Sequence, residues 1–177
     1  MSTRGVIAVK TGLGWRGVYN HLDSYPTYLG PIIWRELQEK DVERVVKEGI
    51  EQHPQGYRSF PDEPYSATSR TEPITNDNVD PLFHEWVYIL DTTKKQKPRL
   101  IVVTSVFVPR LKRGQKGTRI EPNIIRTLDG TIEHIEGGYY VHIVACKADI
   151  GESEPNWALV EARRNIPSLD IIRVERL

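Results

Sequence analysis

Residues 19–30 (Tyr-Asn-His-Leu-Asp-Ser-Tyr-Pro-Thr-Tyr-Leu-Gly) hold the densest group of chemically reactive side chains in the sequence. They include the amide of Asn20, the imidazole of His21 and the carboxylate of Asp23. A carboxylate near an imidazole selects one tautomer and raises its pKa, so His21 and Asp23 could act together as a general base. Asp and Ser side chains also tie down turns and cap helices, and a structural role for the same residues is the alternative.

The same stretch is rich in phenols, and Arg4 and Arg16 lie in the hairpin that leads into it. Tyrosine rings stack on sugars and bases, although packing at the core or its rim is the other reading. We therefore expect a ligand-binding or hydrolytic site at the Asn20–Tyr25 turn. Its binding residues would be Arg4, Arg16, Tyr19 and Tyr25, with Tyr28 as a further ring.

The elements that must position this turn are a hairpin and two helices. Residues 4–10 alternate polar and apolar and predict a strand, and the glycines of 11–14 predict a tight turn. Residues 15–21 then return as a second strand that ends at the turn. Pro31 suits the first turn of a helix that runs to residue 40. Asp41 suits the N-cap of a second helix over 42–53.

The remainder of the chain predicts a sheet and one more helix. Residues 54–81 are rich in Pro, Ser, Thr, Asp and Asn and predict a long irregular loop that could fold over the His21 turn. Clear strands are expected at 85–91, 99–108 and 139–147, the second of them central in the sheet. Weaker strands are expected at 119–125 and 131–135, and a strand or docked tail at 170–177. A helix is expected to start at 153–155 and to end near Asn165.

These elements predict one α+β domain over residues 1–177. Because strands are grouped rather than alternating with helices, we expect an antiparallel sheet, with the N-terminal hairpin, two following helices and a C-terminal helix. A helix-sheet-sheet-helix sandwich is one arrangement that would suit this order.

The charge balance bears on partners. Lys plus Arg and Asp plus Glu both number 24, so the formal net charge is zero, which disfavours sequence-independent nucleic-acid binding. The loop 110–119 nevertheless holds five cations. The alternative to a ligand site is therefore a non-enzymatic module that binds a protein or nucleic acid through the tyrosine-rich turn and this basic loop.

The other reactive residues predict neither a metal nor a cofactor. Cys146 is the only cysteine, lies within a predicted apolar strand and reads as an inert core thiol. The acidic and histidine residues show no recognisable ligand spacing. Strand alternation predicts that His142 shares a face with Tyr140, Val144 and Cys146, and it reads as a buried histidine with satisfied hydrogen bonds. No apolar run reaches the length of a membrane span, so we expect a cytoplasmic protein.

The opening Thr3-Arg4-Gly5 together with Tyr19-Asn20-His21-x-Asp23-Ser24-Tyr25-Pro26-x-x-Leu29-Gly30 resembles a family of small uncharacterised bacterial and phage proteins. The strand Trp-Val-Tyr-Ile-Leu-Asp at 86–91 is similar to a strand of that family. The resemblance covers about the first 35 residues. It implies relatives without implying a reaction.

A more distant similarity is to the N-terminal-nucleophile hydrolases. This similarity implies that Ser2 would become the nucleophile after loss of Met1, with its free α-amine as the base. Arg16, Asn20 and Asp23 would then orient substrate and stabilise an oxyanion. Enzymes of the bile-salt hydrolase type use Cys at this position, where this chain has Ser2.

Overall fold

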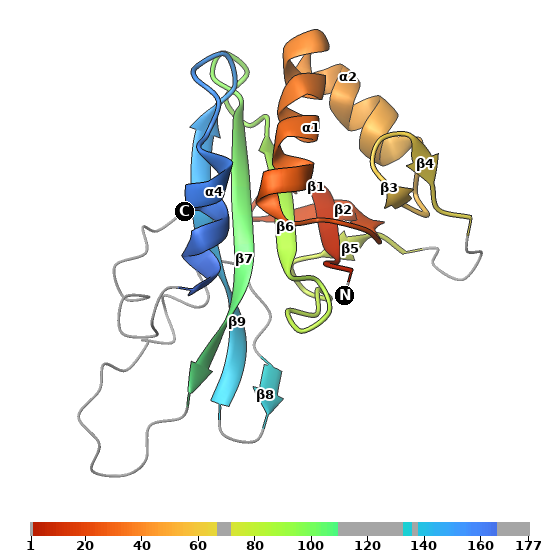
Figure 1. The fold of residues 1–177 in the computed structure, drawn as a ribbon. Helices are drawn as coiled ribbons and strands as arrows, with labels where there is room; N and C mark the ends of the chain where they lie inside the picture. The colour runs from red at the N-terminus through yellow and green to blue at the C-terminus, as the bar shows by residue number, and fades with distance from the viewer. Residues whose placement is uncertain (1, 67–71, 110–132, 136–137, 166–177) are drawn as a thin grey trace.

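The computed structural model describes residues 2–66, 72–109, 133–135 and 138–165, and within them the chain forms two layers (Figure 1). One layer is a nine-stranded sheet, and the other consists of helices packed on one of its faces. The helical segments are α1 (Pro26–Glu39), α2 (Val42–Val46), the π-helix η1 (Lys47–Glu51), α4 (Trp157–Ala162) and the 3-10 turn η2 (Arg163–Asn165). The strands are β1 (Gly5–Thr11), β2 (Gly14–Asn20), β3 (Tyr57–Ser59), β4 (Glu63–Pro64), β5 (Ile74–Thr75), β6 (Trp86–Asp91), β7 (Arg99–Pro109), β8 (Glu133–Ile135) and β9 (Gly138–Asp149).

The α+β class is confirmed, but the expectation of an antiparallel sheet is only partly right, because the sheet is mixed. Its strand order is β4-β3-β2-β1-β6-β7-β9-β8, with β5 paired to β2. β1 pairs in parallel with β6, and β2 pairs in parallel with β3. Parallel pairs need a long connection. For β2 and β3, α1 and α2 supply this connection by returning the chain to β2. The described strands share this one sheet rather than two stacked sheets.

The predicted N-terminal hairpin is present, and its two faces have different neighbours. β1 and β2 pair antiparallel, with Val6 opposite Tyr19 and Ile7 opposite Val18. Ile7 and Val18 pack with the helices, whereas Val6 and Tyr19 belong to the core on the opposite face. Alternate residues of a strand point to opposite faces, so Arg4 and Tyr19 are directed away from the helical layer.

The first helix begins earlier than the sequence predicted. α1 starts at Pro26, not Pro31, and Pro31 lies inside it. Proline is tolerated at the first helical position because its missing N–H would be unpaired there, and Pro26 satisfies this rule as well as Pro31 does. The earlier start brings Leu29 into the core and Gly30 against Trp157 of α4, where an added Cβ would come within 2.4 Å of the indole.

Asp41 caps the second helix as predicted, since its carboxylate accepts a hydrogen bond from the Arg44 amide at 2.8 Å. The helical backbone then changes to the π-helix η1, which the sequence did not indicate. Within 54–81, the described residues form the short strands β3, β4 and β5. The predicted strand at 119–125, the loop 110–119 and the tail 170–177 lie outside the described residues. No helix of the described part is long and apolar enough to span a bilayer.

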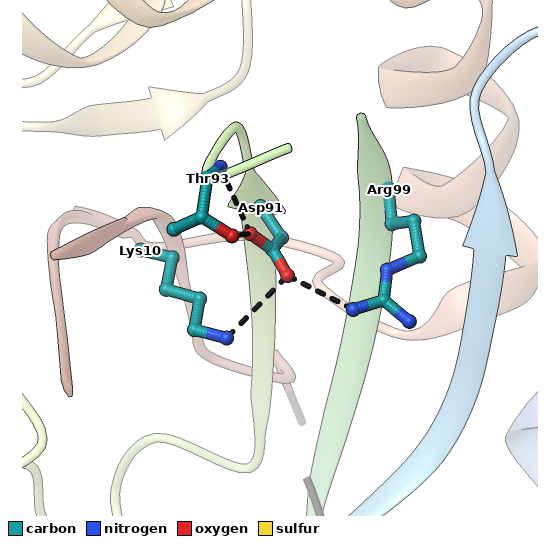
Figure 2. A network of polar contacts seen from close by, with 4 residues as sticks. All are labelled: Lys10, Asp91, Thr93 and Arg99. Atoms are coloured by element: carbon teal, nitrogen blue, oxygen red, sulfur yellow. Dashed lines mark hydrogen bonds and ion pairs between the residues drawn. The ribbon is translucent and has the colours of Figure 1, made fainter. Parts of the chain in front are cut away.

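A buried carboxylate joins three strands at the end of the sheet farthest from the His21 turn (Figure 2). The Asp91 side chain is only 2% exposed, and its Oδ2 accepts from Lys10 Nζ at 3.4 Å and Arg99 Nη2 at 3.2 Å. Its Oδ1 accepts from the Thr93 amide at 3.1 Å and the Thr93 hydroxyl at 2.5 Å. Burial alone would raise the pKa of Asp91, but the Thr93 hydrogen bonds and the two cations outweigh it and lower the pKa.

Asp91→Asn is expected to lower the free energy of unfolding by about 2 kcal/mol at pH 7, because it removes the charge that both cations face. The folded-state pKa of Asp91 is depressed, so its contribution is present above the unfolded pKa of about 4 and is lost as the pH falls through the lower folded value. Urea unfolding at pH 7 and at pH 3 should show the difference from wild type shrinking in acid. Replacement of the exposed Asp62 in Asp62→Asn should leave the free energy of unfolding unchanged at both pH values. An equal effect of both variants would contradict the stabilising role of the Asp91 carboxylate.

Candidate functional site

Asn20 is a structural residue of the turn rather than a free amide. It is 1% exposed, and its Nδ2 donates to the Leu22 carbonyl at 2.7 Å and to the Ser24 hydroxyl at 2.9 Å. Its Oδ1 accepts from the Phe60 amide at 3.0 Å. Every polar atom of the side chain is therefore occupied within the protein, and Asn20 ties the turn to the segment that follows β3.

The rest of the turn is held by the backbone. Ser24 is fully buried, its amide donates to the Thr3 carbonyl at 2.9 Å, and its own carbonyl accepts from the Tyr88 hydroxyl at 2.7 Å. Asp23 adopts φ +46°, a left-handed conformation that Asp tolerates better than most residues. The N-cap of α1 is Tyr25, so neither Asp23 nor Ser24 caps the helix. In the described part of the chain, no hydrogen bond or ion pair links Asp23 to His21.

His21 lies half-buried at the rim of the turn. Its Nδ1 is 2.9 Å from the Tyr19 hydroxyl, and its backbone amide donates to the Tyr57 carbonyl at 2.9 Å. The hydroxyl of Ser2 donates to the His21 carbonyl at 2.8 Å. The structure therefore brings Ser2 to the predicted turn, but it pairs the His21 imidazole with a phenol instead of the Asp23 carboxylate.

Around Tyr19, four more rings meet on the face opposite the helices, and we call this group with Arg4 the His21 cluster. Tyr19 stacks on Phe83 at a centroid distance of 5.7 Å and 18° between planes. It contacts Tyr65 edge-on at 5.9 Å, and Tyr65 lies 5.6 Å from the His21 ring. The members are Arg4, Tyr19, His21, Tyr65, Phe83 and His84.

Arg4 is the charged member of the His21 cluster. Its guanidinium carbon lies 4.5 Å from the centroid of the Phe83 ring. Its Nε is buried and has no hydrogen-bond partner, and among the described residues no carboxylate forms an ion pair with it. A guanidinium held beside a ring without an acidic partner is a suitable donor for an anion.

Two predicted binding residues lie elsewhere. Arg16 forms an ion pair with Glu51 of η1 at 2.9 Å, on the helical side of the sheet. Tyr25 packs with Tyr28 at 5.9 Å between centroids. The three tyrosines of the turn therefore divide into two groups, and only Tyr19 joins the His21 cluster. Tyr65 and Phe83 were missed because neither has periodic neighbours. For Tyr65 the available signal was that 54–81 could fold over His21, and Phe83 lies just beyond that loop.

His142 is buried, as predicted, but it is not fully satisfied. Its Nε2 donates to the His84 carbonyl at 2.9 Å, whereas its Nδ1 has no partner, and the hydroxyl of Ser105, opposite it on β7, has none either. Burial lowers the pKa of His142 to about 4. The expectation that Cys146 shares its face is wrong, because a bulge between Val102 and Val103 shifts the register of β9.

Cys146 packs on the helical side of the sheet, and burial raises the pKa of its thiol, which leaves it poorly ionised at neutral pH. In the parts of the chain that the structure describes, no three His, Cys, Asp or Glu side chains gather in a way that would hold a metal ion.

Comparison of the chain with protein-family models, with curated proteins and with solved structures finds no match in any of the three. The resemblance to small bacterial and phage proteins and the similarity to N-terminal-nucleophile hydrolases therefore stay predictions. The hydrolase hypothesis requires a processed N-terminus at Ser2, which intact-mass measurement of the purified protein would test directly.

Proposed function

We propose that the protein binds a small anionic ligand that carries a planar ring, at the His21 cluster. The observation that carries this proposal is Arg4, whose guanidinium lies beside an aromatic group with a buried, unpartnered Nε and no acidic partner among the described residues. Placing a guanidinium in such surroundings without a partner has a free-energy cost, and an anion that accepts its hydrogen bonds would offset that cost.

The rings beside Arg4 indicate which anion fits. Phe83 is 36% exposed, and His21 and Tyr65 are both partly exposed, so the rim of the cluster is open to contact from outside. Aromatic rings stack on nucleobases irrespective of base identity, typically with about 1–3 kcal/mol per base. An imidazole can add a further hydrogen bond. A nucleoside monophosphate combines the anion and the ring, and it is the probe we choose.

The proposal assigns binding rather than hydrolysis to this face. Asn20, one of the predicted catalytic residues, uses its polar atoms in hydrogen bonds to the backbone and to the Ser24 hydroxyl. Asn20 and Ser24 are better placed to hold His21 in a fixed position at the end of β2. The role of the turn would be to support the binding face.

Isothermal titration with adenosine monophosphate, adenosine and inorganic phosphate tests this function. We expect the monophosphate to bind most tightly, since only it engages both Arg4 and the rings. Arg4→Met keeps an unbranched side chain and removes the guanidinium that lies over Phe83, and it should weaken monophosphate binding about ten-fold or more. Tyr65→Ala should weaken binding of both the monophosphate and adenosine.

Matched controls lie on other surfaces. Arg35→Met removes an exposed arginine from α1, and Tyr28→Ala removes a phenol that is 42% exposed. Both should bind the monophosphate like wild type. Equal binding by wild type and Arg4→Met, or no binding by wild type, would overturn the proposed function.

A further inference from the structure

A second candidate site lies on the helical side of the sheet, where α1, η1 and the segment after β3 meet (Figure 1). There the side chains enclose a half-open cavity of about 270 Å³. This volume lies just below the range of about 300–1,000 Å³ that is typical of sites for drug-sized ligands. The cavity therefore suits a small molecule. Its polar lining consists of Glu36, Lys40, Glu48, Gln52, His53 and Tyr57.

One wall of the cavity is aromatic. The rings of His53 and Tyr57 have centroids 4.9 Å apart, and Tyr57 meets Phe60 edge-on at 5.0 Å. Tyr57 is only 1% exposed, yet its hydroxyl forms no hydrogen bond with another described residue. Burial, assisted by the charge of Glu36, raises the pKa of Tyr57, so its hydroxyl is protonated and can both donate and accept. Tyr57 lines the cavity, so this hydroxyl is available to a ligand bound there.

The opposite wall is acidic and already holds an ammonium group. Lys40 Nζ lies 2.8 Å from Glu36 Oε2 and 3.3 Å from Glu48 Oε2. The hydrogen bonds to Glu36 and Glu48 outweigh partial burial and raise the pKa of Lys40. Glu48 Oε1 also pairs with Arg44 Nε at 2.7 Å, but Arg44 lies outside the lining. Within the lining two carboxylates therefore face one lysine, and among the described residues Glu36 Oε1 forms no ion pair.

From this geometry we infer that the cavity binds a small primary alkylammonium compound. The carboxylates of Glu36 and Glu48 and the hydroxyl of Tyr57 would accept the three N–H bonds, and the rings would cover the alkyl chain and contribute cation–π attraction. Lys40 acts as an internal competitor, because its own ammonium shares the two carboxylates.

The π-helical backbone of η1 shapes this wall. π-Helical turns are rare and occur frequently at functional sites, where the extra residue widens the helix. Here Gly49 of η1 faces Phe60, and an added Cβ would come 3.2 Å from its ring, so the backbone of η1 closely approaches the aromatic wall.

Titration of the ¹⁵N-labelled protein with n-butylammonium, followed by amide chemical shifts of η1, tests the inference. Saturable shifts at Glu48 and Gly49 are expected with n-butylammonium and not with the neutral isostere n-butanol. Tetramethylammonium, which lacks N–H donors, should bind about ten-fold more weakly if hydrogen bonds to the carboxylates dominate. Equal shifts with n-butanol would overturn the ammonium assignment.

Variants separate the roles of the two walls. Glu36→Gln should weaken n-butylammonium binding about ten-fold, whereas Lys40→Met should strengthen it about ten-fold because the competing ammonium is gone. Tyr57→Phe, which changes a single hydroxyl, should weaken it several-fold. Glu43→Gln on the exposed side of α2 is the matched control and should have no effect. Unchanged or weaker binding by a folded Lys40→Met would contradict the inference, and so would unchanged binding by Tyr57→Phe.

Discussion

Asn20→Ala is expected to lower the free energy of unfolding by about 3–5 kcal/mol. The substitution removes three hydrogen bonds and leaves the Phe60 amide and the Leu22 carbonyl without the partner that the amide supplied. Each buried polar group left unsatisfied costs about 1–3 kcal/mol. Small domains have total stabilities of about 5–15 kcal/mol, so this single change would remove a large share. Urea unfolding followed by tryptophan fluorescence measures it.

Asn156→Ala is the matched control for this prediction. Asn156 is an N-cap whose Oδ1 accepts from the Leu159 amide at 3.2 Å, on an exposed helix end. Its loss should cost about 1 kcal/mol, the usual value for a cap. If Asn20→Ala costs no more than Asn156→Ala, then the turn is not the support that we describe, and Asn20 is available for another role.

Acid destabilisation between pH 6.5 and pH 4 is the second large effect we expect. Burial lowers the pKa of His142 to about 4 from an ordinary value of 6.5, while its bond to the His84 carbonyl and the charge of Asp80 oppose the shift only in part. Because the folded-state pKa of His142 is depressed, the stabilisation from its neutral imidazole is complete above pH 6.5. This stabilisation is lost as the pH falls from 6.5 through about 4. The difference corresponds to about 3 kcal/mol.

His142→Gln provides the test, because a glutamine amide can still donate to the His84 carbonyl but does not titrate. Its unfolding free energy should vary less with pH between 6.5 and 4 than that of wild type, by about 3 kcal/mol over the interval. His53→Gln, which alters a partly exposed histidine, should leave the wild-type slope nearly intact. A wild-type slope in His142→Gln would show that another group drives the acid transition.

Much of the local structure could be predicted from periodicity and turn chemistry. The alternation in residues 4–10 and the glycines of the first turn predicted the β1–β2 hairpin, and the Asp41 cap followed from its position before an apolar stripe. The continuous apolar run of β7 indicated a central strand, and β7 does lie between β6 and β9. These features depend on neighbours in sequence, which is why one sequence suffices.

Features set by distant contacts could not be predicted. The parallel pairing of β2 with β3 depends on how α1 and α2 return the chain, and that of β1 with β6 depends on the whole segment between those two strands. The alternation of residues in a strand does not indicate the direction in which it pairs. The bulge in β9 moves Cys146 to the opposite face from His142, an effect of one extra residue that alternation alone hides.

The candidate site shows the same division. Residue types alone drew attention to the turn at His21, and the structure places the Ser2 hydroxyl against the His21 carbonyl. The role of the turn was ambiguous, because Asn, Asp and Ser serve equally well in catalysis and in turns. Only the three-dimensional structure assigns Asn20 to the backbone and brings Tyr65 and Phe83, from a segment with no periodicity, to the His21 ring and Arg4.

The most direct test of the central claim is a ¹⁵N chemical-shift map of the protein titrated with adenosine monophosphate. The account predicts saturable shifts grouped at Arg4, His21, Tyr65 and Phe83, and smaller shifts for Arg4→Met at the same subsaturating ligand concentration. Shifts absent from these residues, or grouped instead around Arg16 and Tyr28, would contradict the claim that the His21 cluster is the ligand-binding face.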